Sequence, residues 1–361
     1  MSFKAENVGS LLRPRELLES RARHERGELT DAELKSIEDR AVDDVIALQE
    51  RAGIDVVTDG ELRRNVFASQ LVQASEGFAP VEDDSVDWFT LEGERETSPV
   101  TVGVVGRLKR RRHLSAEEFV YLRARTRKPT KVTLPSPTMY AYYWVPGVSN
   151  AAYPSQDAYL ADVTDILRDE VSELVRLGAR YIQVDAPELG MLIDPNQRAW
   201  FASKGWDPDR LVHEAADLVN AVLADCLVTT ALHICRGNDA NRYMARGGYD
   251  RIAAEVFPRA AVDVFLLEYD DERSGGFEPL RLVPDDRVVV LGLVSTKRGR
   301  LEDAAELKQR IEEAGRFVDR ERLALSPQCG FASVAGGNAL TVEQEEQKLR
   351  LVADIAREIW G

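Results

Sequence analysis

Two residues that can bind a metal stand at the end of an apolar run in the middle of the chain. His233 and Cys235 close the run that begins at residue 227, which predicts a buried β-strand. Because alternate side chains of a strand point to the same face, the imidazole and the thiol converge. Glu268 ends a second apolar run, and Cys329 follows a third. One imidazole, two thiols and one carboxylate form a donor set suited to zinc.

The elements that must position these side chains alternate regularly along the chain. Segments with helical apolar spacing are expected at 31–52, 156–177, 208–225, 247–257, 301–314 and 341–359. Strands are expected just before Val8 and at 54–58, 131–135, 179–184, 227–234, 262–267, 287–294 and 322–326. Eight strands alternating with helices predict an α/β fold of the (β/α)8 TIM-barrel type, whose catalytic face lies at the C-terminal ends of the strands.

One region interrupts this alternation. Residues 70–128 combine a β-rich piece at 100–105 with a basic run from Arg107 to Arg112 and a helix-start pattern at Leu114. We expect an inserted hairpin and helix between the second and third barrel strands. The basic run is more typical of a solvated hairpin face than of a guide for anionic substrates. No linker rich in Gly or Ser divides the chain, so residues 1–361 are expected to form one barrel domain.

Composition argues against several classes of partner and location. The 361 residues are 44% hydrophobic, and their net charge of −15 disfavours nucleic acid and anionic membranes as partners. No apolar run approaches the ~20 residues of a membrane span, and the amino terminus shows no apolar signal region. Three cysteines, far apart, do not suggest a disulfide framework. A reducing cytoplasm is therefore the expected location.

The predicted ligands also indicate a chemistry. Two thiolates and a carboxylate make zinc a weak Lewis acid for water, yet such a zinc binds a substrate thiol as a nucleophilic thiolate. This favours alkyl transfer to sulfur over hydrolysis. The alternative is a zinc ion with four protein ligands that only stabilises the barrel, although structural zinc sites usually take their ligands from Cys-x-x-Cys knuckles. Arg236 and Asn238, next to the ligands, are expected to orient them.

Six short motifs resemble those of cobalamin-independent methionine synthase, and more closely those of the single-barrel relatives of its C-terminal half. Three of them surround the predicted ligands, and the other three extend the similarity over nearly the whole chain. They are His233-Ile-Cys-Arg-Gly-Asn, Leu266-Leu-Glu-Tyr, Cys329-Gly-Phe-Ala, Val8-Gly-Ser-Leu, Ile54-Asp-Val-Val-Thr-Asp-Gly-Glu and Ile182-Gln-Val-Asp-Ala-Pro.

The resemblance implies how an amino-acid thiol is held. The family binds homocysteine with its sulfur on zinc and its ammonium on acidic side chains. By motif, Glu61 and Asp185 would hold the ammonium, and the backbone N–H at Ser10 would meet the carboxylate. Each residue also follows a predicted strand. The alternatives are that Glu61 pairs with Arg63 or Arg64 on a solvated loop, and that Asp185 caps a turn.

Two departures from the synthases leave the alkyl donor open. We expect no counterpart of the N-terminal barrel that helps to hold folate within these 361 residues, and Asp185-Ala-Pro-Glu stands where the synthases have a motif resembling Asp-Glu-Pro. Single-barrel relatives include proteins that use a corrinoid donor and epoxyalkane:coenzyme M transferases. The aromatic residues after the third barrel strand would either form a wall for the donor or pack beneath the insertion; they are Tyr140, Tyr142, Tyr143 and Trp144.

These observations together predict a zinc-dependent S-methyltransferase that methylates homocysteine or a related thiol. Its expected partners are the thiol and a methyl or alkyl donor, namely a folate, a corrinoid protein or an epoxide. Thiol addition to an epoxide is the alternative reaction. A zinc-stapled barrel that binds a small molecule without turnover is the alternative from another class.

Overall fold

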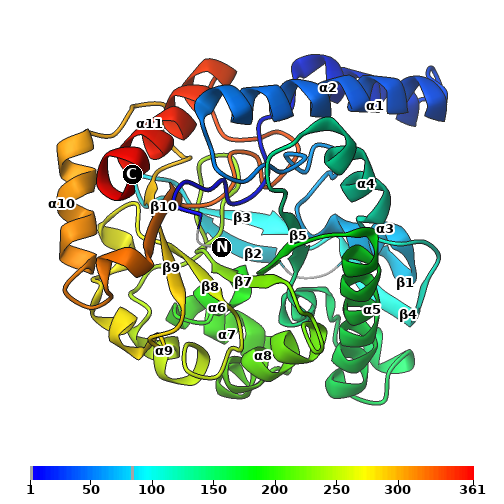
Figure 1. Cartoon of the computed structure of the whole chain (residues 1–361). Helices are drawn as coiled ribbons and strands as arrows, with labels where there is room; N and C mark the ends of the chain where they lie inside the picture. Colours follow the sequence, from blue (N-terminus) through cyan, green and yellow to red (C-terminus); the bar gives the residue numbers. More distant parts are fainter. Residues whose placement is uncertain (1–2, 83–84) are drawn as a thin grey trace.

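The computed structural model describes residues 3–82 and 85–361, and a parallel sheet lies at its centre (Figure 1). Six strands pair side by side in the order in which they occur along the chain. They are β5 (Val132–Pro135), β6 (Tyr181–Asp185), β7 (Thr229–Ile234), β8 (Val264–Glu268), β9 (Val288–Val294) and β10 (Leu323–Pro327).

Two short segments near the N-terminus close this sheet into a ring. Residues 5–6 and 56–57 lie between β10 and β5 and pair through three parallel bridges, Ala5 with Leu325, Glu6 with Val56, and Val57 with Thr130. The ring agrees with the parallel α/β barrel that the alternation predicts. These two segments make single bridges rather than full strands, so they are shorter than the strands expected there.

Side chains pack the inside of the ring. A small apolar cluster takes residues from most of the segments, namely Val8, Val56, Tyr181, Ala231, Val264, Leu266, Val290 and Ala324. A buried ion pair accompanies it, with Lys131 Nζ 2.9 Å from Glu6 Oε2. The barrel interior is therefore filled, as it is in other barrels of this type.

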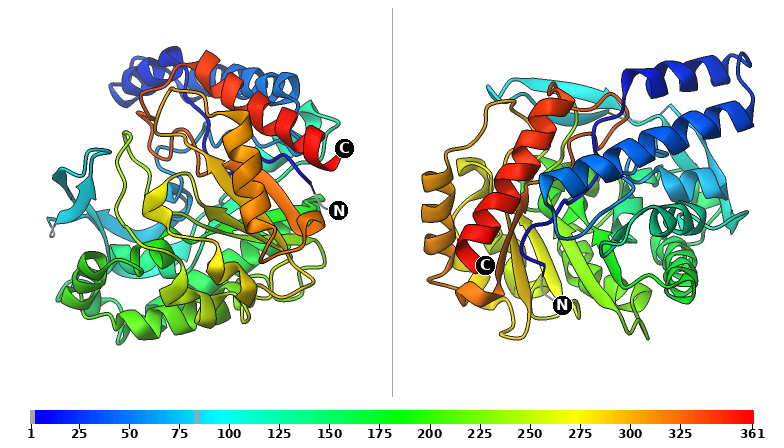
Figure 2. Two further views of the ribbon diagram at one scale, coloured as in Figure 1. Left: turned by 90° about the vertical axis from the view of Figure 1, so that its left-hand side faces the viewer. Right: turned by 45° about the horizontal axis from the view of Figure 1, so that its top comes forward.

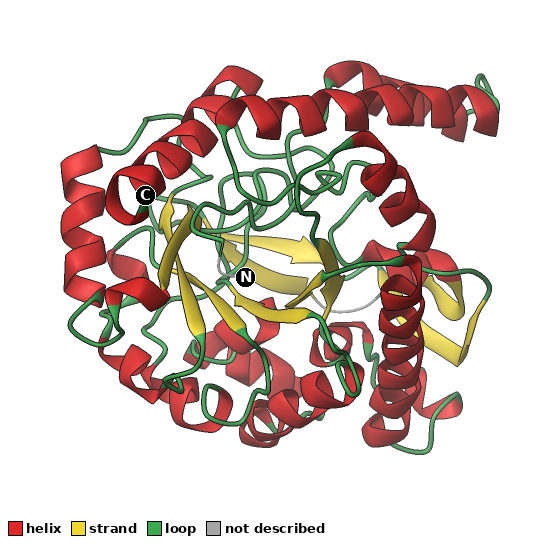
Figure 3. Ribbon diagram, viewed as in Figure 1, coloured by secondary structure: helices red, strands yellow, loops and turns green. Residues whose placement is uncertain are grey.

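Helices surround the strands (Figures 1 and 3). They are α2 (Asp31–Ala52), α4 (Ala116–Arg125), α5 (Gln156–Leu177), α6 (Pro187–Met191), α7 (Pro195–Ser203), α8 (Pro208–Val222), α9 (Asp250–Val256), α10 (Ala304–Ala314) and α11 (Val342–Trp360). Helix α2 has the predicted bounds because Thr30 and Glu33 form a capping box and Gly53 ends the helix with φ at 88°. No helix in the described residues is long and apolar enough to cross a membrane.

Helix α1 (Arg15–Glu25) was not expected from the sequence. It packs against α2, and α11 lies along α2 as well, so the first and last helices share one side of the molecule (Figure 2). Only Leu17, Ser20 and Arg21 of α1 are buried. Its apolar face is too narrow to show a helical period in the sequence.

In its described residues, the region at 70–128 holds four antiparallel strands and two helices. Strand β1 (Ser75–Pro80) pairs with β4 (Val102–Arg110), and β2 (Ser85–Phe89) pairs with β3 (Arg95–Pro99). Helix α3 (Ser69–Ala74) precedes these strands, and α4 follows them. The region is thus richer in strands than the single hairpin expected there. The basic run lies on β4 and just after it.

Candidate metal centre

The predicted metal ligands lie at the C-terminal ends of three strands. His233 is in β7, Cys235 follows that strand directly, and Cys329 comes two residues after β10. Glu268 is the last residue of β8. Parallel strands end on one face of the barrel, so residues distant in sequence gather there.

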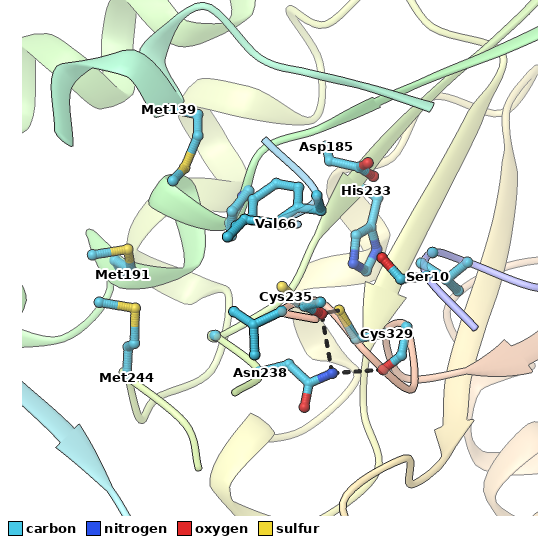
Figure 4. Close-up of a pocket in the computed structure, with 18 of the residues that line it drawn as sticks. Ser10, Val66, Met139, Asp185, Met191, His233, Cys235, Asn238, Met244 and Cys329 are labelled. Carbon is cyan, nitrogen blue, oxygen red and sulfur yellow. Dashed lines mark hydrogen bonds between the residues drawn. The ribbon is translucent and has the colours of Figure 1, made fainter. Parts of the chain in front are cut away.

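Three of the four predicted ligands form one cluster. The ligand atoms of His233, Cys235 and Cys329 lie within 4.8 Å of one another, and all three residues are buried. Figure 4 shows them on one side of a pocket. Glu268 is outside this group. Its role as a ligand stays a prediction.

The imidazole of His233 is oriented for metal binding. Nδ1 lies 3.0 Å from the carbonyl oxygen of Leu266, which requires that Nδ1 carries the proton and donates it. Nε2 is buried and has no hydrogen-bond partner in the described structure. A buried ring nitrogen with a free lone pair, next to two thiols, fits a zinc ion.

The two thiols influence each other's ionisation. Interaction first with Cys235 and then with His233 lowers the pKa of Cys329 well below its usual value. Interaction with Cys329, together with burial, raises the pKa of Cys235. One sulfur is thus already disposed to be a thiolate, which is the form that binds a metal.

The carboxylate of Glu268 is surrounded by cationic residues. Its Oε2 accepts a hydrogen bond of 2.7 Å from the backbone N–H of Arg236, and Oε1 lies 3.0 Å from Arg273 and 3.8 Å from Lys297 Nζ. Burial would raise the pKa of Glu268, but Lys297, Arg273 and Arg236 outweigh burial and lower it to about 2. Sequence reasoning missed Lys297 and Arg273. The one signal for Lys297 is its place just after a buried strand.

Glu61 lies in the same pocket as the cluster and is held in an uncommon backbone conformation, with φ at 55°. Its carboxylate accepts hydrogen bonds from Ser10 Oγ and, at 2.6 Å, from Thr133 Oγ1. Arg64 lies 3.3 Å away. Glu61 is therefore buried and paired with Arg64 while also lining the pocket, rather than lying on a solvated loop. Ser10 lines the pocket too.

Asp185 ends β6 and faces the pocket near His233 (Figure 4). Its Oδ1 accepts a hydrogen bond of 2.6 Å from Gln183. Burial raises the pKa of Asp185 to about 7, although the neighbouring His233 acts in the opposite direction. A cation placed beside this carboxyl would favour its ionised form.

Arg236 and Asn238 support the surrounding backbone. The side chain of Arg236 donates to the carbonyl oxygens of Gly247, Glu268 and Ser274. Asn238 Nδ2 lies 3.2 Å from Ser333 Oγ and also donates to the carbonyl oxygen of Gly330 (Figure 4). The hydrogen bonds of Arg236 and Asn238 thus connect the loop after β7 to the residues after β8 and β10.

Close backbone contacts also fix the loops that carry the cluster. A Cβ atom on Gly190 would lie 1.7 Å from the carbonyl oxygen of Cys235. A Cβ atom on Gly330 would lie 2.6 Å from the nitrogen of Ser10. Only glycine permits these approaches.

The pocket beside the cluster is a cavity of about 160 Å³. Tyr142 and Tyr143 line it, whereas Tyr140 and Trp144 are buried and do not. Of the two roles considered for this aromatic segment, Tyr142 and Tyr143 therefore take the cavity wall, and Tyr140 and Trp144 take buried packing. Three methionines on the opposite side were not anticipated, namely Met139, Met191 and Met244 (Figure 4).

The basic run does not line the cavity. Arg107 lies 3.0 Å from Asp162, and Arg111 lies 3.0 Å from Glu76. These arginines are largely exposed and pair with neighbouring acids, as expected of a solvated hairpin face.

The fold and the cluster define a class of protein: parallel α/β barrels that carry a thiol-rich group able to hold a metal where the strands end. Within that class, the chain belongs to the family described as the catalytic domain of cobalamin-independent synthase, whose family model matches residues 3–358. Its possible zinc site is the cluster of His233, Cys235 and Cys329.

Similar proteins support this membership. The uncharacterized protein YxjH of Bacillus subtilis is 35% identical over 99% of this chain and 95% of its own length. A methionine synthase of Pyrococcus furiosus is 24% identical over 90% of this chain and 85% of its own. The crystal structure of a putative vitamin-B12 independent methionine synthase from Listeria monocytogenes matches with a TM-score of 0.75 and 27% identity, covering 99% of this chain and 98% of that one.

Proposed function

We propose that this protein is a zinc-dependent S-methyltransferase that methylates homocysteine or a closely related amino-acid thiol. The observation that carries the proposal is that His233, Cys235 and Cys329 line the same small cavity as Glu61 and Asp185. In this proposal the residues that would hold a metal and the two carboxylates that would bind an ammonium line one cavity. The methionine synthases among the similar proteins catalyse, by their name, formation of a methylated thiol.

Each residue has a defined task in this proposal. His233, Cys235 and Cys329 would hold zinc, which when bound lowers the pKa of the acceptor thiol and fixes the position of its sulfur. Glu61 and Asp185 would receive the substrate ammonium, which favours the ionised form of Asp185. The N–H of Ser10, close to Gly330, would meet the substrate carboxylate. Arg64 and Thr133 keep the Glu61 carboxylate oriented towards the cavity.

The cavity lining separates homocysteine from coenzyme M. Coenzyme M carries a sulfonate and no ammonium, so it needs a cation in the pocket. Among the described residues no Lys or Arg lines the cavity, whereas two carboxylates do. This favours a thiol with an ammonium group over the acceptor of the epoxide-opening reaction. A cytoplasmic location stays a prediction from the sequence.

Calorimetric titration of the zinc-loaded protein tests the proposal. L-Homocysteine and coenzyme M would each be titrated in two buffers of different ionisation enthalpy. We expect homocysteine to bind with release of a proton and coenzyme M not to bind. A signal from coenzyme M alone would support epoxide opening instead, and silence from both would support a zinc with only a structural role.

A further inference from the structure

Both cysteines of the cluster line the cavity in which the proposed alkyl transfer takes place. A cysteine thiolate is itself a nucleophile, so an alkyl donor in this cavity meets two protein sulfurs as well as the sulfur of the substrate. Alkylation of Cys235 or Cys329 would remove a thiolate ligand of the metal. The hydrogen bonds made to these two sulfurs therefore bear on which sulfur reacts.

The hydroxyl group of Ser333 lies beside one of the two sulfurs. Its Oγ is 3.8 Å from Cys329 Sγ, and Ser333 lines the same cavity. When Cys329 is ionised, its sulfur has no proton to give, so the hydroxyl must be the donor of this hydrogen bond. A hydrogen bond to an ionised acceptor is charge-assisted and is stronger than one to a neutral thiol.

A chain of amide groups fixes the direction of this hydrogen bond. Asn338 Oδ1 accepts from the backbone N–H of Asn241 at 2.8 Å, which identifies the other terminal atom of Asn338 as its nitrogen. Asn338 Nδ2 donates to Asn238 Oδ1 at 2.9 Å, and Asn238 Nδ2 donates to Ser333 Oγ at 3.2 Å (Figure 4). Because Ser333 Oγ accepts from Asn238, its own proton is left for Cys329. Within the described part of the chain, Ser333 Oγ hydrogen-bonds to these two side chains alone.

The other sulfur has a donor of a different kind. Interaction with Cys329 and burial raise the pKa of Cys235, and a hydrogen bond from the backbone N–H of Gly237 opposes them. Each cysteine sulfur of the cluster thus has one donor, a backbone group for Cys235 and a side-chain hydroxyl for Cys329. Only the second can be removed by exchanging a single side chain.

We infer that the Ser333 hydroxyl donates to the Cys329 thiolate and lowers its nucleophilicity, so that the alkyl group passes to the substrate sulfur instead. A sulfur lone pair that is engaged with a proton is less available to attack carbon. Ser333 acts through Cys329 and is therefore a positioning residue. The inference rests on the proposed function, because it takes the metal centre as the place of alkyl transfer.

Alkylation of the zinc-loaded protein by iodoacetamide tests this inference. The cysteine sulfur forms a bond to the methylene carbon while the carbon–iodine bond breaks, and iodide leaves with the electron pair. Peptide mass spectrometry gives the rate at each cysteine separately, and zinc content is measured beside each rate. We expect Ser333→Ala to raise the rate at Cys329 by about 3- to 10-fold, roughly the worth of one hydrogen bond. The rate at Cys235 should not change, because its backbone donor remains.

Two further variants separate the hydrogen bond from the space around it. Threonine and valine have nearly the same shape, but only threonine carries a hydroxyl. Ser333→Thr should therefore keep Cys329 protected, and Ser333→Val should alkylate faster than Ser333→Thr by about the same 3- to 10-fold. Equal rates at Cys329 in these two variants would overturn the inference, since the side chain would then act only through access.

Cobalt substitution examines the Cys329 thiolate without any reaction. Co²⁺ bound by thiolates has a charge-transfer band from sulfur to metal, and loss of a hydrogen bond raises the energy of the sulfur lone pair. We expect this band to lie at longer wavelength in Ser333→Val than in Ser333→Thr, and an unchanged band would contradict the inference. Failure of homocysteine to bind in calorimetry would overturn the proposed function, whereas unchanged reactivity of Cys329 in the Ser333 variants would overturn this inference alone.

Discussion

The ammonium nitrogen of Lys297 lies 3.8 Å from Oε1 of Glu268, and both side chains are completely buried. Arg273 shares the same carboxylate oxygen at 3.0 Å. Lys297 and Arg273 thus place two positive charges next to the cluster of the imidazole and the two thiols. These charges balance the negative charge that Glu268 and the thiolates bring to the site.

Replacement of Lys297 by Met should therefore destabilise the fold. Because Arg273 remains beside Glu268, we expect a loss of about 1–3 kcal/mol in the free energy of unfolding, below the roughly 3–5 kcal/mol of a fully stripped buried charge. Urea unfolding measures this loss in the free energy of unfolding. Lys308→Met, which removes an exposed partner of Glu358, is the control and should cost at most about 1 kcal/mol. The double variant Lys297→Met/Glu268→Gln should recover part of the loss, and strict additivity would contradict the pairing.

Replacement of Cys329 by Ala should remove zinc. The cluster then retains one thiol and one imidazole. Loss of a ligand's hydrogen-bond partner typically lowers metal affinity by roughly 10–100-fold, and we expect loss of the ligand itself to lower zinc affinity further. Zinc content after dialysis against a chelator of known affinity measures the change. Cys226→Ala, a half-buried cysteine outside the cluster, should keep its zinc. Retention of zinc by Cys329→Ala would contradict the proposed centre.

Replacement of Glu61 by Gln should weaken binding of an amino-acid thiol. Loss of the charge that faces the ammonium should cost about 1.5–3 kcal/mol, or roughly 10–150-fold in Kd. Calorimetry with homocysteine measures it. The matched ligand is 4-mercaptobutyrate, which lacks the ammonium and should bind both proteins equally. An equal loss for both thiols would mean that Glu61 acts only through the local structure.

Replacement of Glu345 by Gln should remove a pH dependence of stability. Burial raises the pKa of Glu345 from 4.5 to about 8, while its carboxyl accepts a hydrogen bond from the Leu12 N–H. Between these two pH values the unfolded chain has released a proton that the folded chain keeps, so the free energy of unfolding falls as pH rises and levels off above about pH 8. The variant should lack this fall and be more stable at pH 8 by about 1–3 kcal/mol.

The control for the Glu345 variant is the same substitution at the neighbouring residue, Glu346. Glu346 pairs with Arg51 at 3.0 Å, which lowers its pKa. Glu346→Gln should therefore lose a small stabilisation that is present above the ordinary carboxyl pKa and fades only in acid, so its stability should be slightly and almost uniformly lower between pH 5 and pH 9. Thermal unfolding between pH 5 and pH 9 separates the two variants. Identical profiles would show that burial of Glu345 does not control its ionisation.

Replacement of Gly190 by Ala should disturb the metal centre from the neighbouring helix. The added methyl group would occupy the place of the Cys235 carbonyl oxygen, so the loop after β7 must shift. We expect weaker zinc binding, measured by chelator competition. At Gly336 a Cβ atom meets no atom within 4 Å, and Gly336→Ala should bind zinc normally. Normal binding by Gly190→Ala would indicate that the loop adapts without moving its thiol.

Local sequence signals predicted the regular elements well. Helices α2 and α5 have their predicted bounds because Thr30 and Ser155 cap their first turns and Gly53 and Gly178 end them. Strand ends were predictable because buried apolar runs give way to polar residues there. Placement of His233 and Cys235 on one face followed from the two-residue period of a strand.

Contacts between distant segments were beyond the sequence patterns. The three methionines of the cavity come from separate segments, Met139 after β5, Met191 in α6 and Met244 after β7, and meet only once the ring is closed. Lys297 reaches Glu268 from the segment that follows the neighbouring strand β9. Nothing local in either sequence segment specifies that pairing.

The most direct test of the central claim is X-ray absorption at the zinc edge of the loaded protein, with and without homocysteine. The account predicts two sulfur neighbours from Cys235 and Cys329 before the thiol is added, and one more sulfur afterwards. An unchanged number of sulfur neighbours at saturating homocysteine would contradict it, and the zinc would then have only a structural role.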